Sequence, residues 1–146
     1  MQQINKYNIM ETGYIKILNE EGKIPSVEIQ LVNNNLWISK YNISRLFNVF
    51  NQKIEMNLKS IFKSQLLREQ DVSYIYRYVD NEIEKQIVYY NLEVLIFLSY
   101  RIGTLEAKIF RQFVNSSLRE HLQKKKTPET KLVWAYLPMQ NSYWLN

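Results

Sequence analysis

The sequence predicts an α+β fold, with one domain over residues 1–126 and an aromatic tail over residues 127–146. Residues 14–32 and 72–90 alternate apolar and polar side chains around turn-forming residues, which is typical of antiparallel strand pairs. Apolar residues recur at helical spacing between these two stretches and again after the second. The 146 residues, 46% of them hydrophobic and 23% charged, are enough to bury a core without disulfides.

The first strand pair is expected around the turn "NEEGK", where Gly22 can adopt a positive φ. Val27, Ile29 and Leu31 alternate with polar residues, so we expect these three side chains to face the core. A run of three asparagines then forms another turn before the short apolar stretch "LWI".

Two short amphipathic helices with a turn of a few residues between them are expected next. Ser39 is suited to cap the first helix, the periodicity breaks at Asn48, and Asn51 is suited to cap the second helix, Asn51–Ser64. The side chains expected to face the core are Ile43, Leu46 and Phe47 in the first helix and Ile54, Leu58, Ile61 and Phe62 in the second. This arrangement is a candidate helix-turn-helix.

A β-hairpin is expected from strands at 72–79 and 84–90, with "DNE" between them. A hairpin that directly follows a helix-turn-helix gives a winged-helix-like layout. Its tip carries Asp80, Glu82 and Glu84, and this negative charge would repel phosphate. We therefore expect the hairpin to stay away from DNA.

Two helices are expected to close the core. Asn91 caps a helix that is apolar nearly all round and that Gly103 ends, and Thr104 caps a second helix that runs to about Leu122. The buried face expected for the second helix consists of Phe110, Phe113, Val114, Leu118 and Leu122. The tail contains two tryptophans and two tyrosines, so we expect it to pack on the domain or on a partner.

Positive charge is concentrated in two blocks. Residues 40–68 carry six basic residues and one acidic residue, a net +5, and residues 101–126 carry seven and two, also a net +5. Residues 69–100, between them, carry two basic and six acidic residues, a net −4. Such asymmetry is typical of proteins that bind polyanions, but it also arises when basic residues coat solvated helices.

Little in the sequence supports catalysis, a metal or a cofactor. There is no cysteine, His121 is the single histidine, and three glycines cannot form a phosphate-binding loop. We therefore expect a non-enzymatic protein without a cofactor. The absence of cysteine suits a cytoplasmic location. We also expect no signal peptide and no membrane association, because the longest apolar run is "VLIFL".

If the second helix of the pair is a recognition helix, its N-terminal part would meet base edges in the major groove of double-stranded DNA. That nominates Gln52, Lys53, Met56 and Asn57 as base-contacting residues. The basic residues suited to phosphates are Lys40, Arg45, Lys59, Lys63, Lys108, Arg111 and Arg119. The alternative is that two amphipathic helices joined by a short turn simply share a core.

The sequence contains, in this order, the stretches "WIS", "ISRLF", "NLKSIF", "YYNLEVLIFLSYRI" and "FRQF". Together these stretches resemble the virulence protein RhuM family, which is akin to the N-terminal domains of phage antirepressors. The resemblance covers roughly residues 15–122. It departs from the expected pattern at Asn57, where a histidine is expected, and at Glu106 and Ala107, where a basic residue and a glycine are expected. It implies a DNA-binding protein of phage or mobile-element type, and it gives Arg101 and Arg111 roles beyond surface charge. The alternative for such arginines is pairing with a buried carboxylate or capping of a helix.

A protein-interaction module, such as an antirepressor-like adaptor or inhibitor, is the second functional hypothesis. Its contact surface would be the aromatic tail and the tyrosine-rich hairpin. A homodimer is a further expectation, since helix-turn-helix proteins commonly bind paired half-sites. One continuous basic face would favour DNA, whereas opposed basic blocks and an exposed aromatic patch would favour a protein partner.

Overall fold

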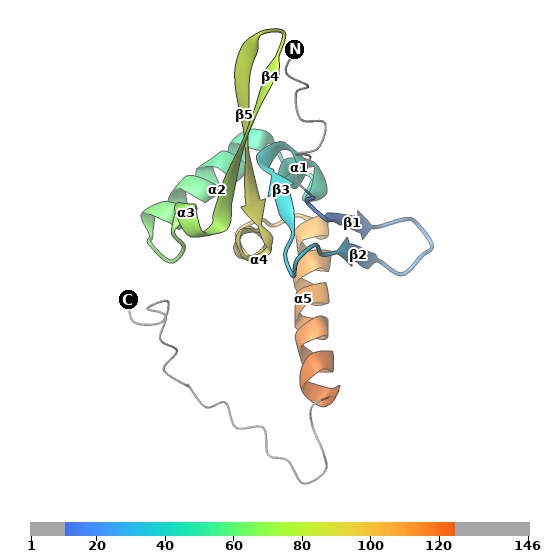
Figure 1. Cartoon of the computed structure of the whole chain (residues 1–146). Coiled ribbons are helices and arrows are strands. Elements are labelled where there is room, and N and C mark those ends of the chain that lie inside the picture. Colours follow the sequence, from blue (N-terminus) through green and yellow to red (C-terminus); the bar gives the residue numbers. More distant parts are fainter. Residues whose placement is uncertain (1–10, 125–146) are drawn as a thin grey trace. The chain divides into compact units, whose positions relative to one another are not determined.

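The computed structural model describes residues 11–124, which form an α+β fold as predicted (Figure 1). The chain divides into two units, residues 1–115 and 116–146, and the boundary lies within the last helix. The elements in chain order are β1 (Tyr14–Leu18), β2 (Ser26–Gln30), β3 (Trp37–Ser39), α1 (Lys40–Leu46), α2 (Asn51–Lys63), α3 (Glu69–Val72), β4 (Ser73–Asp80), β5 (Ile83–Asn91), α4 (Leu92–Ser99) and α5 (Leu105–Lys124). The expected tail at 127–146 lies outside the described residues.

Strands β1 and β2 form the predicted antiparallel pair, in a register that places Tyr14 opposite Gln30. Val27 and Ile29 are half-buried against the core, but Leu31 is 43% exposed, so the prediction for Leu31 was wrong. The reason is that β2 ends at Gln30, and strand alternation no longer sets the direction of the next side chain. Close to the same end of this sheet, Gly13 has a φ of +69°.

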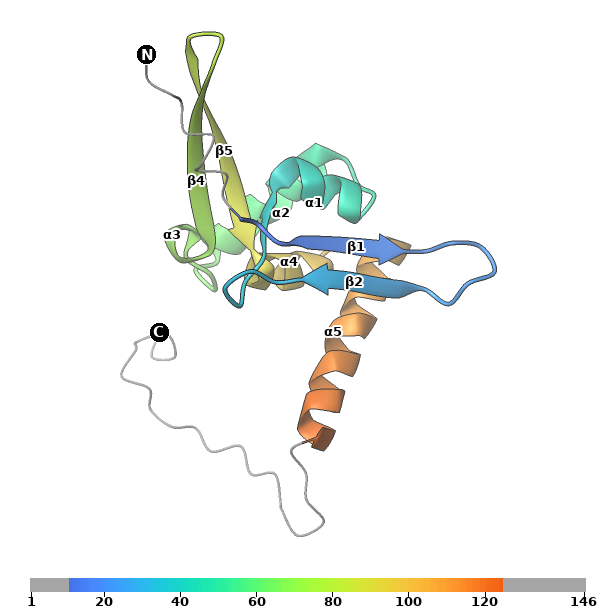
Figure 2. The same cartoon turned by 45° about the vertical axis from the view of Figure 1, so that its right-hand side comes forward.

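The second sheet has the strand order β3-β5-β4. Strand β3, which the sequence showed only as a short apolar stretch, pairs with β5 and places Ile38 opposite Tyr90. Strands β4 and β5 form the predicted hairpin around a two-residue turn, where Asn81 and Glu82 have positive φ. The hairpin extends beyond the helices of its unit (Figure 2), and residues 79–86 are all exposed.

Helices α1 and α2 form the predicted helix-turn-helix pair. Ser39 caps α1 as expected, since its hydroxyl accepts a hydrogen bond from the Asn42 N–H at 3.3 Å. Asn51 does not cap α2: it is the first helical residue, and Phe50 occupies the N-cap position without a side-chain hydrogen bond. The turn is held by Asn48, with a φ of 54°, and by a 3.0 Å bond from the Val49 N–H to the Ser44 carbonyl.

Helices α4 and α5 begin where the caps were predicted. The Asn91 side chain accepts from the Val94 N–H at 3.2 Å, and the Thr104 hydroxyl accepts from the Ala107 N–H at 3.3 Å. Helix α4, however, ends at Ser99 rather than at Gly103. A side chain from the next helix satisfies the carbonyls at this helix end. The Arg111 guanidinium donates hydrogen bonds to the carbonyls of Ser99 and Ile102.

One apolar core lies between the helix pair, the second sheet, α4 and the first turns of α5. Phe47 and Phe110 meet edge to face with ring centroids 5.7 Å apart, and Phe62 stacks on Tyr90 at 6.1 Å. The expected core side chains Ile43, Phe47, Ile54, Leu58, Ile61 and Phe110 are buried, and Leu46, Phe62, Phe113 and Val114 are half-buried against the same core.

The expected burial of Leu118 and Leu122 was wrong, because these side chains are 57% and 42% exposed. Both belong to the second unit. The apolar spacing along α5 continues beyond Val114. Helical spacing alone, however, does not determine which turns of a helix pack against other elements.

Candidate nucleic-acid interface

The outward face of α2 is set by its buried stripe. Ile54, Leu58 and Ile61 are 0–3% exposed and point into the core. At 100° per residue, the opposite side of the helix carries Gln52, Met56, Lys59 and Lys63, and all four are exposed. Lys53, beside them, is also exposed. The side chains nominated for DNA contact from α2 therefore lie on its outer surface, except for Asn57.

Asn57 is half-buried, and its amide is engaged within the protein. Its Nδ2 donates to the Lys53 carbonyl at 2.9 Å, and its Oδ1 accepts from Arg101 Nε at 3.0 Å. Arg101 also donates through Nη2 to Ser60 Oγ at 2.6 Å. A contact between Asn57 and a base, as predicted, would therefore have to compete with these hydrogen bonds. Arg101 itself is exposed, so its guanidinium adds a positive charge to this flank of α2.

On the opposite flank of α2, a positive and a negative side chain neutralise each other. Lys40 and Glu55 form an ion pair between the start of α1 and the second turn of α2. The Lys40 hydrogen bond, the Lys40 charge and the nearby Lys59 charge lower the pKa of Glu55 below its ordinary value. The charge of Lys40, nominated for phosphate, is thus offset by the one carboxylate of α2.

Arg45 lies exposed on α1, in the turn that leads toward α2. Its guanidinium lies 5.7 Å from the centroid of the Tyr41 ring, and its Nη1 donates to the Tyr41 hydroxyl at 3.4 Å. These contacts with an exposed tyrosine leave the positive charge without a carboxylate partner among residues 11–124.

The second basic block does not form one surface in the first unit. Arg101 joins α2, whereas Arg111 is turned onto the carbonyls at the end of α4. This is the helix-capping alternative weighed for Arg111 from the sequence, and it leaves that guanidinium unsuited to phosphate. Lys108 is exposed on α5. Arg119 belongs to the second unit and is exposed there.

Phe50 is a candidate contact residue that the sequence did not reveal. It is 88% exposed and lies at the N-terminus of α2, the part of a recognition helix that usually meets bases. Its spacing from Ile54 and Leu58 would place it in the buried stripe if the helix began earlier. Extended backbone at this residue, with φ −66° and ψ 148°, instead turns the ring away from the core. Phe50 and Met56 could both contact thymine methyl groups.

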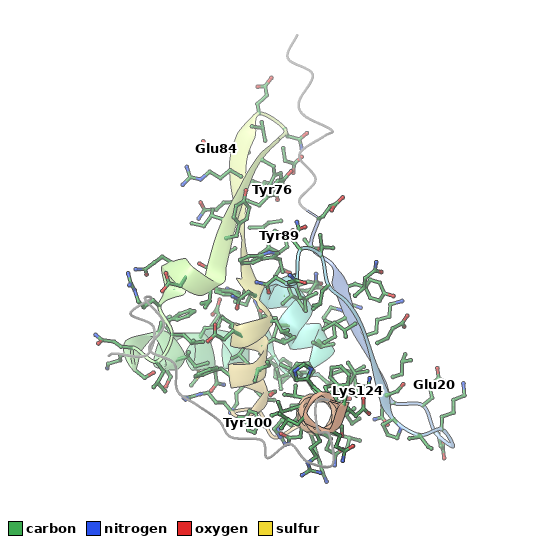
Figure 3. All side chains as sticks on the ribbon, turned by 60° about the horizontal axis from the view of Figure 1, so that its bottom comes forward. Glu20, Tyr76, Glu84, Tyr89, Tyr100 and Lys124 are labelled. Carbon is green, nitrogen blue, oxygen red and sulfur yellow. The ribbon has the colours of Figure 1, made fainter. Side chains whose placement is uncertain are left out.

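Other chemistries find no support among the described residues. Residues 11–124 contain no group of three or more histidine, cysteine, aspartate or glutamate side chains that could hold a metal ion. In the same part of the chain, no helix combines the length and the apolar character needed to span a bilayer. The tip of the hairpin is acidic, as the sequence indicated. Asp80 pairs with Lys85 at 2.7 Å, Glu82 is exposed in the turn, and Glu84 is exposed at the start of β5 (Figure 3).

Comparisons of this chain with protein-family models, with curated proteins and with solved structures found no match. The resemblance to the RhuM family stays a prediction.

Proposed function

We propose that this protein binds double-stranded DNA, without catalysis, by placing the outer face of α2 in the major groove. The observation that carries the proposal is the charge of that face. Lys53, Lys59 and Lys63 are exposed, and none of them is in an ion pair with another described residue. The one acidic residue of α2, Glu55, is held to the side by Lys40.

Each side chain of the face has a role in this proposal. Gln52, Lys53 and Met56, in the first two turns of α2, contact base edges, with Phe50 beside them. Lys59, Lys63, Arg45 and Arg101 contact phosphates and position the helix. Lys40 and Arg111 have no DNA contact in this proposal. Lys40 is paired with the Glu55 carboxylate, and Arg111 donates to two backbone carbonyls. A phage or mobile-element origin rests on the RhuM resemblance alone.

A salt series tests the proposal. Binding of the full chain to random duplex DNA should weaken steeply with salt, because phosphate contacts release counterions. The variant Lys53→Ala/Lys59→Ala should reduce the slope of log affinity against log salt by about one or two. The matched control is Lys16→Ala/Lys23→Ala, which removes the same charge from the β1–β2 strand pair and should leave the slope unchanged.

A second arm of the same experiment addresses Arg101. Arg101→Ala should lower the slope by about one, whereas Arg77→Ala, which removes the same charge from the hairpin, should not. Absence of binding at low salt would refute the proposal. Slopes that are the same for the α2 variant and its control would refute the role of α2.

The hairpin supports the second candidate, a protein-interaction module. Tyr74 and Ile83 on one face of the hairpin, and Ile75 and Val79 on the other, are 46–60% exposed. Exposed apolar area of this kind suits a contact with a protein. The aromatic tail, which this candidate also uses, lies outside the described residues. A chain that fails to bind DNA at low salt, but binds a protein partner through the hairpin, would favour this candidate over the first.

A further inference from the structure

Among the residues that the structure describes, the outer edge of β4 is open. In the strand order β3-β5-β4, β4 pairs with β5 on one side, and no described residue pairs with its other side. The two-residue turn makes Asp80 and Ile83 the closing pair of the hairpin, which exchanges hydrogen bonds. Because such pairs alternate along an antiparallel ladder, the N–H and C=O groups of Ser73, Ile75, Arg77 and Val79 point outward. Among residues 11–124, β5 is the one strand that pairs with β4, and no turn, loop or cap bond engages the outward backbone groups of Ile75, Arg77 and Val79.

This open edge carries few of the features that protect edge strands in natural proteins. It has no proline and no lysine, and its register with β5 runs from Ser73 to Asp80 without a bulge. Between residues 73 and 79 the single charge is Arg77. Tyr74, Ile75 and Val79 are 48%, 46% and 54% exposed beside it. An edge of this length and composition is suited to pair with another strand.

The strand is complementary to itself. A two-fold axis at Tyr76 would place Tyr76 opposite its own copy, Tyr74 opposite Tyr78, and Ile75 opposite Arg77. The pairs Ile75–Arg77 and Ser73–Val79 would then exchange the outward hydrogen bonds, about eight in all. The tyrosines would form cross-strand pairs on one face of the extended sheet, and the stem of Arg77 would cover Ile75 on the other.

Charge selects both the direction and the register of this pairing. Antiparallel strands separate the two acidic tips, where Figure 3 shows Glu84, to opposite ends of the shared ladder. Parallel strands would place the tips side by side. A two-fold axis at Arg77 would oppose two guanidinium groups, which is unfavourable. An axis at Tyr78 would leave only residues 76–80 paired. The axis at Tyr76 therefore gives the longest pairing without opposed like charges.

We propose that a second copy of this chain pairs antiparallel with the open edge of β4, about a two-fold axis at Tyr76. The occupant is a second copy because the tyrosine spacing and the charges match the strand to itself. The pairing joins two three-stranded sheets into one six-stranded sheet, and the strands that meet contain no residue of α2. This inference does not depend on DNA binding.

Cysteine crosslinking in the full chain tests both the pairing and its register, because the natural sequence has no cysteine. In an antiparallel pair, directly opposed residues that do not exchange hydrogen bonds have Cα atoms about 4.5 Å apart, within the range that a disulfide spans. Tyr76→Cys should therefore form a disulfide-linked dimer under mild oxidation. Tyr74→Cys is the matched control: it places a thiol on the same face of the strand, but opposite Tyr78 of the copy.

The result expected is crosslinking of Tyr76→Cys at least about tenfold faster than that of Tyr74→Cys, with circular dichroism showing that both variants are folded. A charge pair gives an independent readout by sedimentation equilibrium. Ile75→Glu should strengthen the dimer, since the new carboxylate would face Arg77 of the copy, and Ile75→Lys should weaken it. Equal crosslinking rates for the two cysteine variants, a monomer at all concentrations, or the opposite order of the two charge variants would overturn the proposal.

Discussion

Gly13 shows how one residue sets the position of the first strand pair. Its φ of +69° lies in the left-handed region, and a Cβ added there would lie 2.4 Å from the Gln30 carbonyl oxygen. Next to it, the Thr12 carbonyl accepts a 2.9 Å hydrogen bond from the Trp37 N–H, which links this strand pair to the start of β3. Glycine is thus required both for conformation and for space.

We predict that Gly13→Ala lowers the free energy of unfolding by about 2 kcal/mol or more, because the strain of a positive φ is joined by a clash with backbone. Gly22→Ala is the control, since Gly22 has a φ of +79° but open space around its Cα. It should cost about 1 kcal/mol. Urea unfolding of both variants measures the difference. Equal losses would show that the Gln30 carbonyl moves aside at no cost.

Local chemistry made some residues predictable, and distance in sequence hid others. Ser39, Asn91 and Thr104 were assigned as caps because a cap bonds to a backbone group only two or three residues away. The hydrogen bond between Arg101 and Asn57 joins residues that are 44 positions apart, and no local sequence pattern indicates it. Asn57 was therefore nominated for bases without the partner that engages it.

At the scale of elements, the Lys40–Glu55 pair joins the first turn of α1 to α2. The pKa of Glu55 is lowered in the folded state, mainly by the hydrogen bond from Lys40. The pair therefore adds stability above the ordinary pKa of 4.5, and this contribution disappears as the pH falls through the lowered value.

We predict that Glu55→Gln lowers the urea midpoint slightly at about pH 7 and leaves it unchanged at about pH 2, where both proteins carry a neutral side chain. The effect is small because the pair is partly exposed to solvent. Glu21→Gln, which removes the same charge from the β1–β2 turn, serves as the control. A midpoint difference that persists at acid pH would assign the effect to packing instead of charge.

Element boundaries were predictable where a residue with a special conformation or a cap marks them. The hairpin turn and the starts of α1, α4 and α5 fall in this class. The end of α4 does not, because Arg111, from the following helix, satisfies its carbonyls. The start of α2 was misassigned at Asn51 because the sequence offers a good capping residue one position after the N-cap that the backbone uses.

At the scale of the whole molecule, the fold class followed from periodicity, but the sheet order did not. Strand β3 has three residues, too few to show alternation, and its partner β5 is about 50 residues away. Pairing at this distance is decided by the core that the strands share with the helices, through Ile38 and Tyr90. The placement of Arg101 beside α2 depends on the same packing.

If DNA binding and β4 pairing both hold, the complete assembly should carry two recognition helices related by two-fold symmetry. We predict that the disulfide-linked Tyr76→Cys dimer binds random duplex DNA with about twice the salt slope of its reduced, dilute monomer, because two sets of phosphates are engaged. The same salt series, run with and without reductant, measures the change. An unchanged slope would mean that pairing through β4 leaves only one α2 able to reach the duplex.

The contrast between Arg111 and the lysines of α2 has an evolutionary consequence. Arg111 donates to two backbone carbonyls from a single nitrogen, Nη1. The side chain of a lysine is one bond shorter, so its ammonium would not reach both carbonyls from position 111. Lys59 and Lys63 present charge to solvent, where either a lysine or an arginine can contact a phosphate. Among descendants of this sequence, position 111 should therefore remain arginine, while positions 59 and 63 change between the two cations. The most constant positive charge would then mark the architecture, and the exchangeable ones would mark the proposed DNA surface.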